Sequence, residues 1–487
     1  MNYLSLAFAG FVLLLMILYY VAQKKALGWV VLLAGSIIFY CSFDLKYLMF
    51  LGFAALSTYG CALCLQKVKH KKLLTALCIT ANIGVWFWAK ALSWTVALSS
   101  NIFEFLGFQA NWWFSPILVP VGISYFTLQA IAYLVDVSSG KIHPEKNPAK
   151  YLLFIAYFPA IVQGPISRYN ELMPQLLNNK PFHFESMRKS VILILFGLVK
   201  KMVVADRLAI FVNACFNGYQ TLSGVVLYLG AVGYAIQLYM DFSGCVDICR
   251  GVSSLFHVNL VNNFNRPYLS TSIKDFWSKW HMSLSRWLRD YVYIPLGGNR
   301  KGTGRKYLNL LITFLVSGLW HGAGFSFFLW GALHAAYQII GQATKDVRER
   351  LKARVGIISG SFSERIYQTV ITFHLVTFAW IFFRAPTLAD AFQYLQHMFS
   401  EFNFYALTAP IFELGVNQNQ FLLLILHLFV FLIADIFSKQ QEALLEGINN
   451  QHIILRWVVL YILVMDVFLL GVYGPGYDMS GFLYGGF

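Results

Sequence analysis

The chain has 487 residues, of which 58% are hydrophobic and 12% are charged, and its mean hydropathy is +0.60. These values lie outside the usual range of soluble domains and exclude an arrangement of two or three such domains. The net charge of +15 could suggest nucleic-acid binding, but the Lys and Arg residues stand in short clusters between apolar runs. Such clusters are typical of cytoplasmic loops. The composition therefore predicts a polytopic membrane protein that binds no nucleic acid.

Apolar runs of about 20 residues, the length that crosses a bilayer, recur along the whole chain. They lie at residues 4–22, 27–43, 45–66, 73–98, 116–135, 223–249, 308–341, 368–383, 421–437 and 453–473. We expect an all-α membrane protein with about ten to twelve spanning or re-entrant helices. We further expect one membrane domain over residues 1–487, with peripheral helices at 1–98, a core at 101–341 and C-terminal helices at 342–487.

The first apolar run is not preceded by basic residues and is followed by Lys24 and Lys25, the reverse of a cleavable signal peptide. It should remain as a helix with its N-terminus outside, so that odd-numbered helices end in the cytoplasm. The seven cysteines are an odd number, which argues against a complete disulfide framework. Cys61 and Cys64 form a C-x-x-C with no second pair or histidine nearby, so we predict no metal site.

Several apolar runs are interrupted. Pro120 and Gly122 break one run, and residues 151–176 form a stretch too short to span, which predicts a re-entrant or half-length helix. Lys200 and Lys201 stand inside an apolar pattern, which predicts two short helices meeting at a polar bend. Irregular backbone at membrane depth is tolerated where it is buried or lines a cavity.

The run at 223–249 carries the acidic residues Asp241 and Asp247 as well as Ser243. Ionisable groups at membrane depth cost about 2.5 to 3.5 kcal/mol on insertion scales, and they face a partner or a cavity. Two interpretations stay open: a structural ion pair, for instance with Arg250 or Arg207, or a direct role in a functional site.

A histidine lies in the aromatic and basic segment Phe276–Tyr291. On one helix at about 100° per residue, the aromatic side chains share one arc, the charged ones the other, and His281 falls at the edge of the apolar arc. This pattern predicts an interfacial amphipathic helix. A nucleotide phosphate loop is excluded in the following PLGGNRKGTGRK, because Thr303 stands where the motif requires lysine.

A second histidine, His321, lies near the middle of about 29 uncharged residues, between Trp320 and the glycines Gly322 and Gly324. The glycines allow the helix to break and a ligand to approach the backbone. A buried imidazole in its neutral form can accept a proton from a hydroxyl and later return it. A satisfied structural histidine is the alternative, and it is the interpretation we apply to His334 and His374.

These segments carry a family resemblance. DFWSKWHMSLSRWLRDYVYIPLGGNR followed by SGLWHGAGFSFFLWGALHAAY resembles the membrane-bound O-acyltransferase family, in its bacterial branch of alginate and peptidoglycan O-acetylation membrane proteins. VPVGISYFTLQAIAYLVDV, FPAIVQGPISRYNELMPQL and LYMDFSGCVDI extend the match, and so do NFNRPYLSTSIKDFW and the C-terminal AWIFFRAPTLADAF and YGPGYDMSGFLYGGF. The resemblance therefore covers most of the chain.

The resemblance implies a ring of helices around a thin centre, with a tunnel that brings a cytoplasmic acyl donor to the site. It implies that His321 is the essential histidine and His281 the second functional polar position. Candidate tunnel or support residues are Asp241, Ser243, Trp320, Trp280 and Ser317.

The function implied is O-acetylation of a cell-envelope polysaccharide, alginate-like or peptidoglycan, by a multi-pass protein of the bacterial inner membrane. The resemblance implies no tightly bound cofactor, a cytoplasmic thioester (acetyl-CoA) as the donor, contact with membrane lipid, and a separate extracytoplasmic acetyltransferase of the SGNH type as partner. The alternatives are D-alanyl transfer to teichoic acid, acyl transfer to lipid or protein, and a non-enzymatic transporter of acyl groups or solutes. A transporter predicts repeated halves, and we find no internal repeat.

Overall fold

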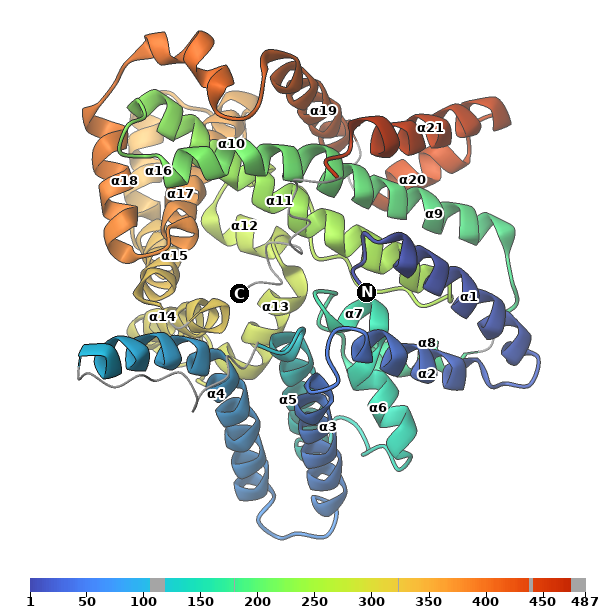
Figure 1. Ribbon diagram of the computed structural model, residues 1–487. Coiled ribbons are helices and arrows are strands. Elements are labelled where there is room, and N and C mark those ends of the chain that lie inside the picture. Colours follow the sequence, from blue (N-terminus) through green and yellow to red (C-terminus); the bar gives the residue numbers. More distant parts are fainter. Residues whose placement is uncertain (106–118, 179, 323, 438–440, 474–487) are drawn as a thin grey trace. The chain divides into compact units, whose positions relative to one another are not determined.

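Figure 1 shows the computed structural model, which describes residues 1–105, 119–178, 180–322, 324–437 and 441–473. Every regular element in these residues is a helix. The last part of the resembling C-terminal segment, residues 474–487, lies outside the described residues.

Seven helices of the described chain are long and apolar enough to cross a membrane. They are Leu6–Gln23, Tyr47–Cys64, Lys71–Lys90, Gly224–Ser254, Phe362–Arg384, Gln418–Ile436 and Ile453–Leu470, and two shorter apolar helices are Gly28–Cys41 and Ile123–Ser138. Most large apolar side chains of the first and the last two spans are exposed, as a lipid environment requires. The predicted all-α, multi-pass membrane protein is confirmed.

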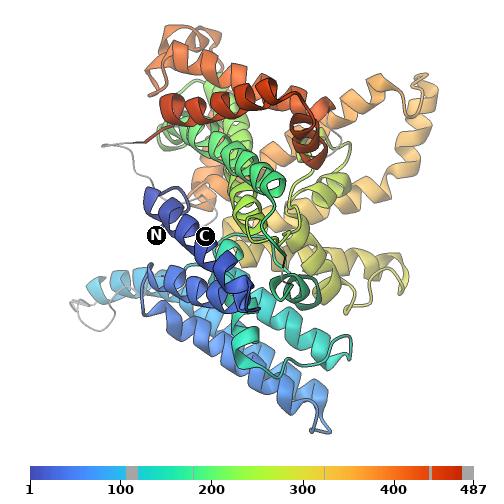
Figure 2. The same cartoon turned by 90° about the vertical axis from the view of Figure 1, so that its right-hand side faces the viewer.

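The chain divides into two compact units: Met1–Ser190 with Cys249–Val261, and Val191–Ile248 with Asn262–Phe487. The first contains α1 (Leu6–Gln23), α2 (Gly28–Cys41), α3 (Tyr47–Cys64), α4 (Lys71–Phe105), α5 (Ile123–Ser138), α6 (Pro148–Ala156), α7 (Phe158–Ile161) and α8 (Tyr169–Leu176). In this unit α1 packs against α2, and α3 lies beside α4 and α5 (Figures 1 and 2).

The first unit also confirms short helices in the interrupted stretch 151–176. Here α6 ends at Ala156 and the single turn of α7 follows from Phe158. The freed backbone of Phe158 is buried and satisfied by side chains: its N–H donates to Ser36 Oγ at 3.1 Å, and its carbonyl accepts from the Tyr3 hydroxyl at 2.8 Å. The chain therefore leaves helical geometry here with both backbone groups of Phe158 paired.

The second unit begins in α9 (Phe184–Leu198). It continues with η1 (Val199–Ala205), α10 (Asp206–Asn217), α11 (Gly224–Ser254, whose last turns belong to the first unit), η2 (Pro267–Leu269), α12 (Ile273–Lys279), α13 (Met282–Leu288), η3 (Arg289–Tyr293), α14 (Gly302–His321), α15 (Phe325–Ala343), α16 (Lys345–Arg354), α17 (Phe362–Arg384) and α18 (Leu388–Ser400). The remaining elements are η4 (Phe404–Leu407), η5 (Ala409–Glu413), α19 (Gln418–Phe437), α20 (Gln441–Asn449), α21 (Ile453–Met465) and η6 (Asp466–Leu470).

The lysine-bearing segment of this unit is one continuous rod rather than two helices meeting at a bend. A π-helical stretch, η1, joins α9 to α10 and contains both lysines. The rod crosses α11 closely, because a Cβ on Gly197 would lie 2.6 Å from the carbonyl oxygen of Gly244. A π-helical turn within a longer helix often accompanies a functional or structurally demanding position.

The long apolar run at 308–341 is broken, as its glycines permit, into α14 and α15. The helices pack closely, because a Cβ on Gly331 would lie 2.4 Å from the carbonyl oxygen of Phe314, and one on Gly318 would lie 2.3 Å from that of Phe327. This contact between two backbones determines the position of His321 at the end of α14.

Gly331→Ala should lower the thermal midpoint of the detergent-solubilised protein, since overpacking costs about 1 to 3 kcal/mol. Gly341→Ala on the same helix is the control, because a Cβ there meets nothing within 4 Å. This substitution should leave the midpoint unchanged or raise it slightly, because alanine favours the helix by up to about 1 kcal/mol. Equal midpoints in the two variants would contradict the close packing.

Candidate active site

The chain leaves helical geometry at His281. The single amphipathic helix predicted over Phe276–Tyr291 is wrong: α12 ends at Lys279, Trp280 is extended, and α13 begins at Met282. His281 itself has φ 44° and ψ 54°, in the left-handed region. Non-glycine residues rarely adopt this region, and such strain persists where the surroundings impose it, often at functional sites.

A loop that precedes α12 in the sequence stabilises this break. The carbonyl oxygen of Asn263 accepts from the N–H of Met282 at 3.0 Å, and the Asn263 side-chain oxygen accepts from the N–H of Ser283 at 3.0 Å. The N–H of Asn265 donates to the carbonyl of Lys279, also at 3.0 Å. Asn263 is fully buried. The loop therefore pairs backbone groups that one uninterrupted helix would have paired internally.

His281 is fully buried rather than at the surface edge predicted from the helical pattern. Its ring meets Phe242 of α11 edge-on, with the ring centroids 4.8 Å apart. Burial lowers the pKa of His281 to about 3. The imidazole therefore stays neutral at physiological pH.

This buried, neutral histidine predicts a pH-dependent stability. The unfolded chain binds a proton near pH 6.5 whereas the folded chain does not, so stability decreases as the pH falls from about 6.5 toward 3. Between pH 7 and pH 5 the loss is about 2 kcal/mol. The thermal midpoint of the wild type should therefore fall further over this interval than that of His281→Gln. Parallel pH dependence of the two proteins would contradict a neutral His281.

The second histidine, His321, is the last residue of α14 and is 3% exposed. The helix ends there because Gly322 is extended, with φ −175°, and a Cβ on Gly322 would lie 2.3 Å from the ring of Phe327. The His321 ring contacts Trp330 of α15 and Phe383 of α17 at centroid distances of 5.2 Å and 5.1 Å.

Trp320 brings the two histidines together. Its ring lies 5.9 Å from that of His281 and 4.8 Å from that of His321, measured between centroids. The histidines are 40 positions apart in sequence, yet one indole contacts both. All three belong to the second unit and are buried. A neutral imidazole has one N–H donor and one nitrogen acceptor. Two imidazoles beside one aromatic ring can therefore donate a hydrogen bond to a carbonyl group and accept a proton from a hydroxyl.

The other candidate residues have different surroundings. Trp280 is fully buried and its ring stacks on Phe276 at 5.4 Å and contacts Trp380 at 5.2 Å, so it anchors α12 to α17. Ser317 is fully buried one turn before His321 on α14, and its Oγ has no hydrogen-bond partner among the described residues.

Asp241 and Asp247 form buried ion pairs with the lysines of η1. Lys200 Nζ lies 2.7 Å from Asp247 Oδ2, and Lys201 pairs with Asp241. Lys201 also lies 2.9 Å from Asp206. Of the two interpretations of the acidic residues, these contacts match the structural ion pair. The cations are lysines, whereas the sequence suggested Arg250 or Arg207.

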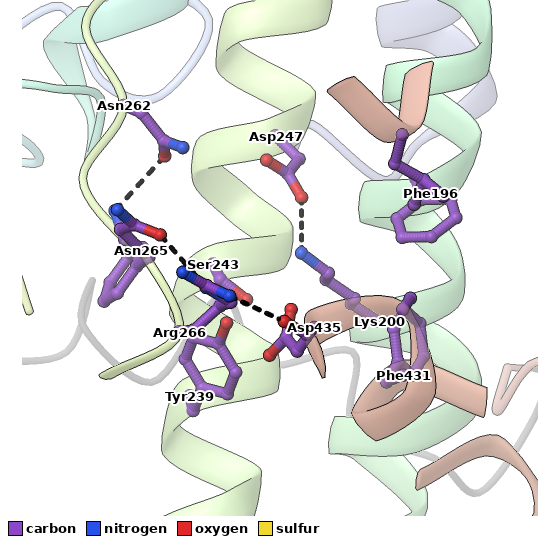
Figure 3. Close-up of a pocket in the computed structure, with 13 residues that line it drawn as sticks. Phe196, Lys200, Tyr239, Ser243, Asp247, Asn262, Asn265, Arg266, Phe431 and Asp435 are labelled. Carbon is purple, nitrogen blue, oxygen red and sulfur yellow. Dashed lines mark hydrogen bonds and ion pairs between the residues drawn. The ribbon is translucent and has the colours of Figure 1, made fainter. Parts of the chain in front are cut away.

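Ser243 lines a separate polar cavity of about 40 Å³ in the second unit (Figure 3). The cavity lies between η1, α11, the loop at residues 262–266, and α19, and Ser243, Lys200 and Asp247 face it together with Arg266. Arg266 donates to the carbonyl oxygen of Asp435 at 3.1 Å. Phe242, the residue before Ser243 on α11, contacts His281. Successive residues of a helix point in different directions, so Ser243 lies on a different side of α11 from His281.

Two sets of contacts in this part of the protein were not predicted from the sequence. Trp330 and Phe383 contact His321 but stand among many aromatic residues, and no spacing distinguishes them. The sequence did indicate that Lys200 and Lys201 form ion pairs, because charged residues inside apolar runs pair with opposite charges at membrane depth. Sequence alone did not show which lysine meets which aspartate.

Comparisons with known proteins identify the family of this chain. The family model of the membrane-bound O-acyltransferase family matches residues 123–378. The chain is 33% identical to the probable alginate O-acetylase AlgI of Pseudomonas aeruginosa over 79% of this chain and 72% of the relative. It is 32% identical to the peptidoglycan O-acetyltransferase of Helicobacter pylori over 76% and 73%.

A more distant relative is the teichoic acid D-alanyltransferase of Bacillus subtilis, 28% identical over 54% of this chain and 68% of the relative. The family model covers both histidines and Trp320. The chain therefore belongs to the membrane-bound O-acyltransferase family and is a membrane-embedded O-acyltransferase.

Proposed function

We propose that this protein transfers an acetyl group from a cytoplasmic thioester, acetyl-CoA, to an acceptor on the outer side of the bacterial inner membrane, for O-acetylation of a cell-envelope polysaccharide. The observation that carries the proposal is the contact of both His281 and His321 with one buried residue, Trp320. The two most extensive similarities above, to an alginate O-acetylase and a peptidoglycan O-acetyltransferase, support acetyl as the group.

In the proposed reaction His321 acts as the general base. Its imidazole accepts the proton of the acceptor hydroxyl while the hydroxyl oxygen attacks the carbonyl carbon of the thioester. The tetrahedral intermediate collapses, the C–S bond breaks, and the imidazolium returns the proton to the departing thiolate. The products are an O-acetyl ester and a free thiol, so atoms and charge balance.

His281 is better suited to hold the thioester carbonyl than to act as base. General bases work best when their pKa lies near the working pH, and burial lowers the pKa of His281 to about 3. A neutral imidazole still offers one N–H donor. This donor strengthens its interaction with the carbonyl oxygen as negative charge develops there. The two histidines thus divide the proton-accepting and carbonyl-polarising roles.

A deletion strain tests the proposed function. Loss of O-acetyl groups from the envelope polysaccharide, restored by the wild-type gene, is the expected result. Loss of D-alanyl esters instead, with O-acetyl groups unchanged, would assign the activity of the more distant relative, the teichoic acid D-alanyltransferase, to this chain. Unchanged levels of both esters would overturn the proposal. Repeating the assay without the proposed extracytoplasmic SGNH-type partner separates acetyl export from final transfer.

A further inference from the structure

A third histidine, His334, lies next to the two already described. It is fully buried on α15, one turn after Trp330. The Trp330 ring contacts both His321 and His334, at centroid distances of 5.2 Å and 5.0 Å. His334 and the proposed base therefore contact the same indole.

The hydrogen bonding of His334 defines its protonation. Trp277 Nε1 of α12 donates to His334 Nδ1 at 3.2 Å. An indole nitrogen only donates, so Nδ1 carries no hydrogen, and the neutral ring has its hydrogen on Nε2. That Nε2–H is buried and has no acceptor among the described residues. A buried donor left unsatisfied costs about 1 to 3 kcal/mol, so this arrangement calls for an acceptor from outside the chain.

Two more buried donors without a partner in the described residues lie nearby: Ser317 Oγ and Trp330 Nε1. Ser317 lies one turn, about 6 Å along the helix axis, before His321. The His334 ring stacks on Phe314, which lies about 10 Å before His321 on the same axis. Three unsatisfied donors thus lie around His321 and toward the start of α14.

The start of α14 gives this group a direction. Arg300, Lys301, Arg305 and Lys306 precede the apolar part of the helix, and such a cluster is expected on the cytoplasmic side. His334 and Ser317 therefore lie between the cytoplasmic end of α14 and His321. In the proposed function the thioester donor comes from this cytoplasmic side.

We propose that His334 Nε2–H and Ser317 Oγ donate hydrogen bonds to carbonyl oxygens of the acyl-thioester arm, namely its amide or thioester carbonyls, and so position the donor at His321. The inference rests on the proposed function. His334 is a positioning residue for the acyl donor, and its Nδ1 bond to Trp277 aims the Nε2–H at the arm.

Two substitutions separate this role from a purely structural one. His334→Asn retains an oxygen near Nδ1 for the Trp277 N–H but has no donor at the Nε2 position, whereas His334→Gln retains a donor near Nε2 and removes the Nδ1 acceptor. In everted membrane vesicles, with acetyl-CoA as the varied substrate, His334→Asn should raise the KM for acetyl-CoA about tenfold with an unchanged thermal midpoint. His334→Gln should keep the KM and lower the midpoint.

The opposite result would be a wild-type KM in His334→Asn and a loss of both stability and activity in His334→Gln. His334 would then only bind Trp277 and stabilise the fold, and the inference would be overturned. Ser317→Ala provides a second measurement that does not depend on the folding of either variant, because it removes no hydrogen bond between described residues. It should raise the KM several-fold, and an unchanged KM overturns the role of Ser317. Absence of acetyl transfer by the wild type in the same vesicles would instead refute the proposed function.

Discussion

His321→Ala should lower O-acetyl transfer by about 10² to 10⁴-fold, the range that a positioned general base contributes. The imidazole is buried at the end of α14 against Trp320, Trp330 and Phe383, and alanine has no group that could accept the proton of the acceptor hydroxyl. The O-acetyl content of envelope polysaccharide measures the loss, together with the amount of protein in the membrane fraction. The loss should appear in kcat, because the base acts in the chemical step.

The matched control is His374→Ala. His374 is also a histidine within a spanning helix, but it is exposed and bonds to Tyr228 at 2.7 Å. This variant should retain O-acetylation. His321→Gln, which keeps polarity without a basic ring nitrogen, should be as inactive as His321→Ala. An active His321→Gln variant would contradict proton acceptance by His321 and favour a hydrogen-bonding role.

The second large effect is expected at the buried ion pairs. Lys201→Met removes the cation that faces Asp241 and Asp206, and Asp241 is only 1% exposed. Leaving one member of a buried pair uncompensated costs about 3 to 5 kcal/mol. The membrane fraction should contain much less of this variant, and its thermal midpoint in detergent should fall by several degrees.

Two comparisons make this prediction specific. Lys141→Met breaks an ion pair with Asp136 in which the lysine side chain is 60% exposed, and such pairs contribute about 0 to 1 kcal/mol. Its level and midpoint should match the wild type. Adding Asp241→Asn to Lys201→Met removes the stranded charge and should recover much of the lost stability. A double variant as unstable as Lys201→Met alone would show that packing, rather than charge, explains the loss.

Elements governed by local rules were predictable from the sequence. Seven of the ten apolar runs correspond to helices long and apolar enough to cross a membrane, because a bilayer requires about 20 apolar residues with internally paired backbone. Thr387 and Asp390 stand three positions apart, the spacing of a capping box, and the structure has both of its reciprocal bonds at the start of α18. The break after His321 followed from its neighbouring glycines.

His281 shows the limit of this reasoning. A helical pattern places it at the edge of an apolar arc, yet the chain leaves the helix there and buries the ring completely. The loop containing Asn263, almost 20 residues earlier, supplies hydrogen bonds that replace those lost where the helix breaks. A periodicity argument treats each segment as isolated and therefore cannot include such a partner.

The sequence by itself determined that this protein lies in a membrane and where its long apolar helices lie along the chain. It also carries the resemblance that implies functional roles for His281 and His321. These properties depend on the local composition of each segment. The tertiary structure alone decided that Trp320 contacts both rings, that Lys200 and Lys201 neutralise the aspartates of α11, and that His334 lies beside the site. Each of these depends on contacts between separate segments of the chain. Burial makes such contacts necessary, because a buried polar group cannot form hydrogen bonds with water instead.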